Sequence, residues 1–270
     1  MVNQGSPKPP LCLIIEHNGG KKGAKPIILV GKGIIFDTGG YNLKPTKSIE
    51  DMNMDTAGAS AVIGLFSALK ELDIKQNVIG IIPLTENSIG GEAAFPSNII
   101  TMLNGKTVEI RSTDAEGRMI LADALTYGAE RDPKYMIDVA TLTGAVIYAL
   151  GDRYSAMFTN DKELKERLLK AGEDASDNLW ELPLHKEHKE KMKSHIADLR
   201  NIDDGSAHLA GSSKGAAFLS YFIHDKKGAD KAWAHIDIAA TAYTVDPRKY
   251  ELRGGTGVGV RLLIKFLEQL

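Results

Sequence analysis

Short apolar runs alternate with amphipathic stretches along most of this chain, and this alternation constrains its fold more than any other feature. Five runs are short, apolar and strand-like: Leu11–Ile15, Ile27–Val30, Val78–Leu84, Met136–Val139 and Trp233–Ala239. Three stretches have helical character: Ala57–Leu72, Arg118–Ala129 and the segment that ends with Leu263, Phe266, Leu267 and Leu270. Helices that alternate with strands predict an α/β fold with a helix-covered mixed, mostly parallel sheet.

The first ten residues differ from the rest of the chain. Residues 1–10 contain three prolines and no apolar periodicity, which predicts a linker-like N-terminal segment. They lack the charged-then-apolar order of a signal peptide, and no later apolar run approaches the ~18 residues that a membrane helix needs. Residues 11–270 show no internal repeat and are predicted to form a single domain. We therefore expect a cytoplasmic protein with no membrane partner.

The composition of the chain excludes several kinds of partner and site. The chain has 33 Lys and Arg against 35 Asp and Glu, a net charge of −2, so nucleic acid is not an expected partner. Cys12 is the one cysteine, which excludes an intramolecular disulfide and a cysteine-based zinc site and fits a reducing compartment. Because Cys12 stands in an apolar run, it is predicted to be a buried core thiol.

The segment from Ser112 to Arg118, STDAEGR, combines acids, a glycine and a base. If the strand-like pattern before it continues, Asp114 and Glu116 point to the same side, where two carboxylates repel unless cations bridge them. Arg118 then opens a helix whose first amides favour an anion. The segment thus predicts metal-binding oxygens beside an anion pocket. The alternative is a solvated acidic turn that caps a helix.

A second segment, from Lys32 to Asp55, has the same mixture of charges and glycines. Lys32 and Asp37 bracket a short apolar run, and Lys44 follows a pair of glycines. Asp55 stands just before the helix that begins near Ala57, so it could bind a metal or simply cap that helix.

The charges of these residues suit two metal ions. Two divalent cations ~3.5 Å apart repel each other by roughly 19 kcal/mol at an effective dielectric constant of 20. Four carboxylates match the four positive charges: Asp37, Asp55, Asp114 and Glu116. A lysine ligand such as Lys32 would have to lose its proton, which a metal can enforce, while Lys44 could stay charged and face the substrate.

The order of these motifs resembles the leucine (cytosol) aminopeptidase family of two-metal exopeptidases. Four motifs recur in family order: VGKGIIFDTGG followed by Lys44, DMNMD with Asp55, TDAEGR followed by LADAL, and DVATLTGA. The resemblance runs from Leu11 to the C-terminus and implies that residues 11–270 form a di-metal aminopeptidase catalytic domain.

The resemblance also implies a role for each site residue. The tighter metal site would be formed by Lys32, Asp37, Asp55 and Glu116, and the more exchangeable site by Asp37, Asp114 and Glu116. The two ions of each subunit would be Zn or Mn, and carboxylate-rich sites also accept Mg or Co. A hydroxide that bridges the ions would attack the peptide. Lys44 would hydrogen-bond the scissile carbonyl oxygen, and Arg118 would hold a bicarbonate ion that acts as general base.

The implied substrates are peptides with an apolar, leucine-like first residue. Thr141, Leu142 and Gly144 would line the cleft, and Met52 the pocket for the first side chain. Family members are hexamers, built as dimers of trimers, and carry a separate N-terminal domain where this sequence has residues 1–10. We therefore expect a homo-oligomer, either a trimer or a hexamer.

Some positions depart from the family pattern or carry local expectations. Ser112 stands where relatives usually have Asn, and Thr56, Ala57 and Gly58 stand where many have a glycine pair; we expect tuning of the site and a slightly different helix entry. Asn160 with Glu163 resembles a capping box. The resemblance also implies that residues 203–215 form a mobile loop near the cleft.

Three other functions remain as alternatives. Asp37-Thr38-Gly39 is the triplet of aspartic endopeptidases, but those enzymes are all-β and need a second such triplet. A two-metal phosphoesterase shares the carboxylate chemistry but commonly uses histidines, which these motifs lack. The third alternative is a non-catalytic assembly protein that retains the aminopeptidase fold.

Overall fold

The structure, a computed structural model, describes residues 1–205, 209–247 and 252–270. Its centre is a sheet with strand order β1-β4-β2-β7-β11-β8-β9, in which β3 also pairs with β4. The strands are β1 (Leu11–Asn18), β2 (Ile27–Gly31), β3 (Gly33–Asp37), β4 (Asn77–Asn87), β7 (Tyr135–Ala140), β8 (Ser155–Thr159), β9 (Leu179–Glu181) and β11 (Trp233–Asp237). Among the described residues, five of the seven pairings are parallel and two, β1–β4 and β11–β8, are antiparallel. The predicted mixed, mostly parallel sheet is therefore confirmed.

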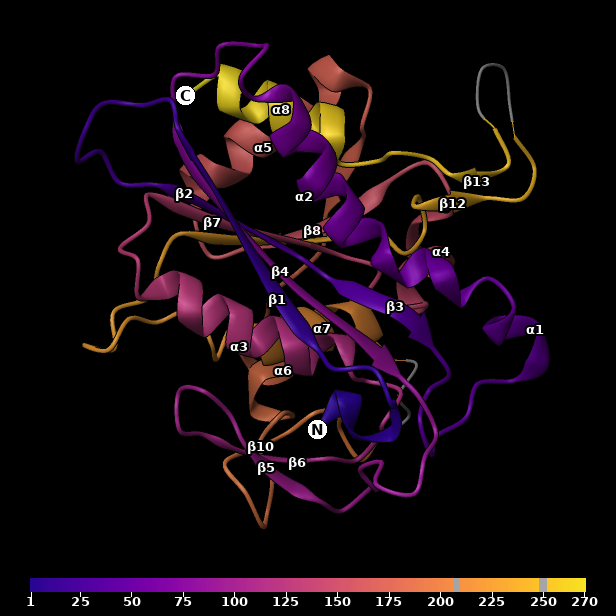
Figure 1. Ribbon diagram of the computed structural model, residues 1–270. Helices are drawn as coiled ribbons and strands as arrows, with labels where there is room; N and C mark the ends of the chain where they lie inside the picture. Colours follow the sequence, from indigo (N-terminus) through magenta and orange to yellow (C-terminus); the bar gives the residue numbers. More distant parts are fainter. Residues whose placement is uncertain (206–208, 248–251) are drawn as a thin grey trace.

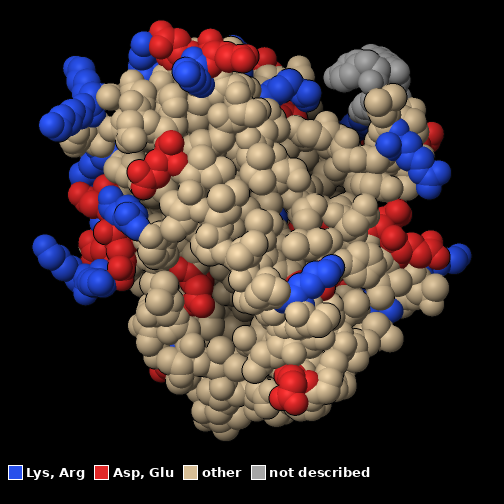
Figure 2. Space-filling model, viewed as in Figure 1, with Lys and Arg blue, Asp and Glu red and all other residues tan. Residues whose placement is uncertain are grey.

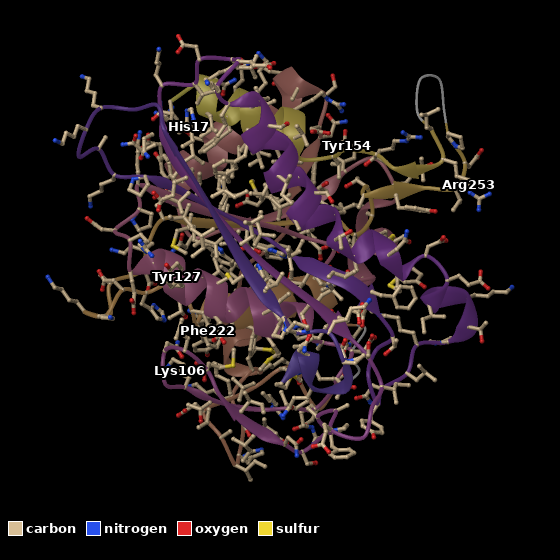
Figure 3. All side chains as sticks on the ribbon, viewed as in Figure 1. His17, Lys106, Tyr127, Tyr154, Phe222 and Arg253 are labelled. Atoms are coloured by element: carbon tan, nitrogen blue, oxygen red, sulfur yellow. The ribbon has the colours of Figure 1, made fainter. Side chains whose placement is uncertain are left out.

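Helices cover both faces of this sheet (Figure 1). One face carries α2 (Ala57–Ala68), α5 (Lys162–Ala175) and α8 (Val260–Glu268). The other carries α3 (Gly117–Ala129), α6 (Lys186–Glu190) and α7 (Gly211–Leu219). Each face buries its own apolar cluster, so the strands between them are buried on both sides. Tyr127 and Phe222, labelled in Figure 3, lie in the layer of α3 and α7.

Shorter elements complete the fold. They are the 3₁₀ helices η1 (Val2–Gly5) and η2 (Met52–Thr56), the helices α1 (Thr46–Ile49) and α4 (Ala145–Leu150), and the strands β5 (Ile99–Thr101), β6 (Thr107–Glu109), β10 (Leu199–Arg200), β12 (Tyr243–Thr244) and β13 (Gly254–Gly255). The strands β10, β6 and β5 form a small separate sheet, and β12 pairs with β13 in a projecting hairpin (Figure 1).

A glycine lets α2 lie directly on the sheet. A Cβ on Gly58 would stand 2.1 Å from the carbonyl oxygen of Val139 in β7 and 2.9 Å from the backbone nitrogen of Lys32. Neither backbone atom can move without shifting its strand, so the close approach requires glycine here. This contact places the start of α2, and with it the neighbouring η2, against the ends of β2 and β7.

The segment that the sequence predicts to be linker-like packs on the sheet. Within residues 1–10, Met1 and Val2 contact the apolar cluster on the α3 face. The Ser6 hydroxyl donates a hydrogen bond of 2.7 Å to Glu86, at the end of β4. These contacts hold the segment beside β4.

Three local predictions from the sequence are wrong, and a fourth is wrong in part. Cys12 is exposed, because β1 is the edge strand of the sheet. Helix α2 ends at Ala68, so the Leu72 side chain is not on its apolar face but is exposed. Helix α5 is capped by Asp161, whose carboxylate accepts the Leu164 amide, and not by Asn160.

The fourth concerns the expected mobile loop over residues 203–215. Its last five residues, Gly211 to Gly215, form the first part of α7, and four of them are buried. Residues 206–208 of that prediction lie outside the described residues. The helix packs against α3.

The surface shows where apolar side chains remain exposed. In the view of Figure 2, charged side chains gather toward the rim and few lie over β1. Leu11, Leu13 and Ile14 of this strand are exposed. None of the helices in the described ranges is long and apolar enough to cross a membrane.

Candidate metal and substrate site

A cavity of about 960 Å³ opens at the carboxyl ends of the central strands. Lys32 follows β2, Thr141 follows β7 and Ala239 follows β11, and all three line the cavity. Loops that leave the same edge of a parallel sheet converge there, which makes this edge the usual place for a ligand site in an α/β fold.

The first group of charges in the cavity is centred on Lys32. Its ammonium nitrogen lies 2.7 Å from Asp55 Oδ1 and 3.0 Å from Glu116 Oε1, and it donates a hydrogen bond of 2.9 Å to the Thr141 carbonyl oxygen. All of these residues, Thr141 included, are nearly inaccessible to solvent. The group brings together η2, the start of α3 and the end of β7.

The second group is centred on Lys44. Its ammonium nitrogen lies 2.9 Å from Asp37 Oδ2 and 2.5 Å from Asp114 Oδ1. Asp37 ends β3, and its Oδ1 accepts hydrogen bonds from the Gly39 amide and, at 2.7 Å, from the Asn87 side chain. The positions of Asp37 and Lys44 are thus defined by the tight turn through Gly39, which has a φ of 86°.

The carboxylates of the two groups approach one another closely enough to hold a metal ion. One oxygen each of Asp37, Asp55 and Glu116 lies within 4.8 Å of the others, and all three residues are buried. Asp55 Oδ2 and Glu116 Oε2 are buried and have no hydrogen-bond partner among the described residues. Buried carboxylate oxygens without partners are costly unless a cation binds them, so this donor set fits divalent metal ions. Asp114 joins the set through Lys44.

The crowding of charges changes the acidity of these groups. Burial raises the pKa of Asp55 to about 7, against the opposing effect of Lys32. Burial likewise raises the pKa of Asp114 to about 6. For Lys32 and Lys44, burial alone would lower the pKa, but the surrounding carboxylates outweigh it and the pKa of each lysine is raised.

Arg118 lies behind this cavity in the first turn of α3. The residue is buried, and its Nη1 donates a hydrogen bond of 2.7 Å to the Asn201 carbonyl oxygen. Burial lowers the pKa of Arg118 to about 10, so the guanidinium remains charged at neutral pH. Its buried Nε has no partner among the described residues, which fits a site for a small anion such as bicarbonate.

The structure places the predicted cleft residues on the wall of the same cavity. Met52, Thr141, Leu142 and Gly144 all line it. The Thr141 hydroxyl donates a hydrogen bond of 2.7 Å to Asp55 Oδ1, which links the cleft wall directly to the carboxylate group. Apart from Arg118, every residue that the sequence assigned to the site lines this cavity.

One detail of the sequence interpretation is wrong, and one alternative is excluded. The extended form does not continue through STDAEGR: Asp114 lies in a turn and Glu116 is the N-cap residue of α3, so the two carboxylates meet different lysines. Asp55 does not cap α2, because the N-cap residue is Thr56 and no side chain caps that helix. The carboxylate of Asp55 turns instead to Lys32.

Sequence reasoning missed two residues that shape the site. Asn87, at the end of β4, donates to both Asp37 and the Thr113 carbonyl oxygen and so joins the two acidic segments. Tyr243 lines the cavity, and its hydroxyl donates a hydrogen bond of 3.2 Å to Asp51. Tyr243 carries no local signal in the sequence. Asn87 was a reasonable candidate, because it is a polar residue at the carboxyl end of a buried strand.

The chain is similar to known proteins along nearly its whole length. Residues 1–264 match a family described as the cytosol aminopeptidase family, catalytic domain. The chain is 48% identical over 268 residues to a probable cytosol aminopeptidase of Syntrophotalea carbinolica, which covers 99% of this chain and 52% of that protein. A probable cytosol aminopeptidase of Methylobacillus flagellatus is 46% identical over 268 residues, with the same coverage of both chains.

A solved structure is also similar to this chain. The bottromycin maturation enzyme BotP is 37% identical and superposes with a TM-score of 0.91, over 99% of this chain and 56% of that one. The α/β fold is therefore shared. The chain spans about half the length of the curated relatives it matches.

Proposed function

This chain belongs to the cytosol aminopeptidase family, and from that premise we propose that it is a metal-dependent aminopeptidase that removes apolar, leucine-like residues from the N-termini of peptides. The observation that carries the proposal is the group formed by Asp37, Asp55 and Glu116, whose oxygens lie within 4.8 Å of one another in a cavity large enough for a peptide end. Two of these oxygens lack partners among the described residues and so are available to cations.

In this proposal four carboxylates and one lysine hold two divalent ions. The ligands are Lys32, Asp37, Asp55, Asp114 and Glu116. When bound, such ions acidify a water molecule, polarise the scissile carbonyl group and take the free amine of the peptide. Zn or Mn fit this mixed set of one nitrogen and several oxygens, and Mg or Co suit its carboxylates.

The remaining charged residues act on the substrate. Lys44 keeps its proton because Asp37 and Asp114 raise its pKa, and it donates a hydrogen bond to the carbonyl oxygen as negative charge develops there. Arg118 would hold a bicarbonate ion, which when bound would supply a general base.

The cavity wall sets the preference for the first residue. Met52 and Met54 of η2 line it together with Ala239, Ala240 and Thr241 from the loop after β11. Flexible thioethers beside small side chains form an adaptable apolar surface, which favours leucine-like side chains.

The cellular location and the assembly of the chain are proposed from the same premise. We propose that it works in the cytoplasm, as the names of its relatives indicate, and that it assembles as a trimer or hexamer. The exposed apolar side chains of β1, including Leu11 and Ile14, are consistent with contact between copies. Native mass spectrometry tests the assembly, and a monomer at micromolar concentration would contradict it.

The function is tested with leucine p-nitroanilide and a series of added metals. Turnover that needs a divalent metal is expected, together with no cleavage of the N-acetylated anilide, because the free amine is part of recognition. The Asp55→Ala variant serves as the control for contaminating peptidases. If the metal-loaded chain binds two ions and cleaves no anilide or peptide, the non-catalytic alternative holds instead.

A further inference from the structure

Asn201 is a fully buried asparagine beside the loop that carries Asp114 and Glu116. It directly follows β10, and its backbone amide donates a hydrogen bond of 3.0 Å to the Glu109 carbonyl oxygen. This bond extends the parallel pairing of β10 with β6 by one residue. The backbone of Asn201 therefore already joins the two strands, and its side chain has a different task.

The side-chain amide of Asn201 bonds the loop that follows β6. Its Oδ1 accepts hydrogen bonds from the backbone amides of Arg111, at 2.8 Å, and Ser112, at 3.2 Å. Its Nδ2 donates one of 2.6 Å to the Ser112 carbonyl oxygen and a longer one of 3.5 Å to that of Ala115. Two acceptor sites and two hydrogens are the full capacity of an amide side chain. A carboxylate of the same shape could donate neither bond, so the contacts fit asparagine and not aspartate.

These hydrogen bonds bracket one proposed metal ligand and adjoin the other. Asp114 lies between Ser112 and Ala115, and its own amide donates a hydrogen bond of 3.2 Å to the Ser112 hydroxyl. Glu116 directly follows Ala115. Because the backbone on both sides of Asp114 is bonded to Asn201, loss of the asparagine side chain should change where both carboxylates lie relative to the other ligands.

The same loop is held from its other side through Thr113. The Thr113 amide donates a hydrogen bond of 2.8 Å to Asn42 Oδ1, and its carbonyl oxygen accepts one of 3.1 Å from Asn87. Asn87 also bonds Asp37, so this side of the loop is tied to the segment of another proposed ligand. The loop is thus fixed between that segment and Asn201.

The backbone of Asn201 also holds Arg118. Its carbonyl oxygen accepts a hydrogen bond of 2.7 Å from Arg118 Nη1, and the arginine is buried in the first turn of α3. One residue therefore bonds both the loop that precedes α3 and a side chain that extends from the start of that helix. This arrangement sets the position of the guanidinium relative to the carboxylates of Asp114 and Glu116.

We infer that Asn201 is a positioning residue of the active site, which fixes the loop of Asp114 and Glu116 relative to Arg118. It touches neither the proposed metal ions nor the substrate, and it acts through the backbone of the ligand loop. The inference rests on the proposed function for its effect on catalysis, whereas its effect on metal binding can be measured without turnover.

Zinc binding by the folded chain tests the inference. Asn201→Ala removes all four side-chain hydrogen bonds, and the affinity for the more weakly bound Zn²⁺ ion should fall about 10–100-fold, as is usual when a residue that orients a ligand is lost. Isothermal titration measures the affinity, at a temperature well below the Tm of the variant. An unchanged affinity would overturn the inference, because it would show that Asn201 only stabilises the fold.

Asn77→Ala is the matched control. Asn77 begins β4, at the end of the sheet away from the cavity, and its side chain makes the same kinds of bonds. It accepts the Gly20 amide at 3.0 Å and donates to the carbonyl oxygens of Lys21 and Ala24. Its loss should lower Tm and leave Zn²⁺ affinity unchanged. An equal fall in affinity in this control would show a general loss of stability and would overturn the inference.

Asn201→Ser is the second variant if Asn201→Ala does not fold. Serine leaves a hydroxyl group in place of the amide, so some polar contact with the loop remains. It should weaken Zn²⁺ binding in the same direction but less. Zinc affinity equal to that of the unmutated chain would also contradict the positioning role.

Turnover tests the connection with Arg118. In the metal-loaded chain, Asn201→Ala is expected to lower kcat by about tenfold or more, and the loss should be smaller in the Arg118→Met background. An equal loss in both backgrounds would overturn the part of the inference that concerns Arg118. If the unmutated chain cleaves nothing, the proposed function fails, while the zinc titration still decides whether Asn201 positions the metal ligands.

Discussion

Lys32 and Asp55 form a buried ion pair, with Nζ and Oδ1 2.7 Å apart, although Lys32 follows β2 and Asp55 lies in η2. The same ammonium lies 3.0 Å from Glu116 Oε1, so two buried carboxylates share one ammonium group. Metal ions that bind these carboxylates must compete with that ammonium, and Lys32 must lose a proton to become a ligand. The metal chemistry of the site therefore depends on proton binding.

Removal of a clustered carboxylate should abolish tight metal binding. Asp55→Ala and Glu116→Ala each delete an oxygen that has no other partner, and we expect metal affinity to fall by at least about a hundredfold, more than a change outside the ligand set costs. Isothermal titration with Zn²⁺ measures this. Asp51→Asn is the control, since Asp51 lines the same cavity but bonds Tyr243. Equal affinities for all variants would show that the metals bind elsewhere.

Lys44→Ala should separate metal binding from catalysis. Its ammonium touches Asp37 and Asp114 but is assigned to the substrate carbonyl, so its loss should lower kcat by about 10²–10³-fold. Metal content, measured by inductively coupled plasma mass spectrometry, should stay at two ions per chain. Full turnover by this variant would refute the carbonyl role of Lys44.

The stability gained from metal should shrink as the pH falls. Burial raises the pKa of Asp55 to about 7 and that of Asp114 to about 6, so the folded chain binds these protons more tightly than the unfolded chain. The metal-free chain therefore gains stability as the pH falls below about 7, while metal affinity falls because protons compete. Calorimetry between pH 8 and 5.5 should show the Tm values of loaded and metal-free protein converging. Asp55→Asn should weaken this convergence, and a constant difference would contradict the argument.

Gly58→Ala should disturb both the packing of α2 and the metal group. The added Cβ would meet the Val139 carbonyl oxygen at 2.1 Å, and the shift of α2 should cost about 1–3 kcal/mol despite alanine's better helix propensity. Scanning calorimetry should show Tm lower by about 2–10 °C. Gly64→Ala in the same helix is the control, because its Cβ would contact only the Val260 side chain. A larger loss in Gly64→Ala than in Gly58→Ala would contradict this account.

Local sequence patterns predicted the central strands and the charged residues of the site well. The strands β2, β4, β7 and β11 lie where short apolar runs occur, because a strand buried between two helical layers needs apolar side chains on both faces. The charged cavity residues also came from local patterns, since acids and lysines beside glycines mark loops where the backbone turns sharply. The uncharged cleft residues Met52, Thr141, Leu142 and Gly144 came from the family resemblance. The membership of the family was evident from the same motifs.

Tertiary structure decided which of these charges meet. From the sequence, Asp55 could as well have capped a helix and Asp114 could have shared a face with Glu116, because short-range spacing does not specify the path of a loop. The structure pairs Asp55 with Lys32 and Asp114 with Lys44, since loops from several strands converge at one edge of the sheet.

The sequence by itself therefore determined the α/β fold and the set of charged residues at the site, because apolar periodicity and residue type are local properties. It could not reveal that Lys32, Asp55 and Glu116 meet in one buried group, or that Gly58 lets α2 lie directly on the sheet beside it. Burial, unpaired charge and close approach arise only when segments far apart in the chain pack together.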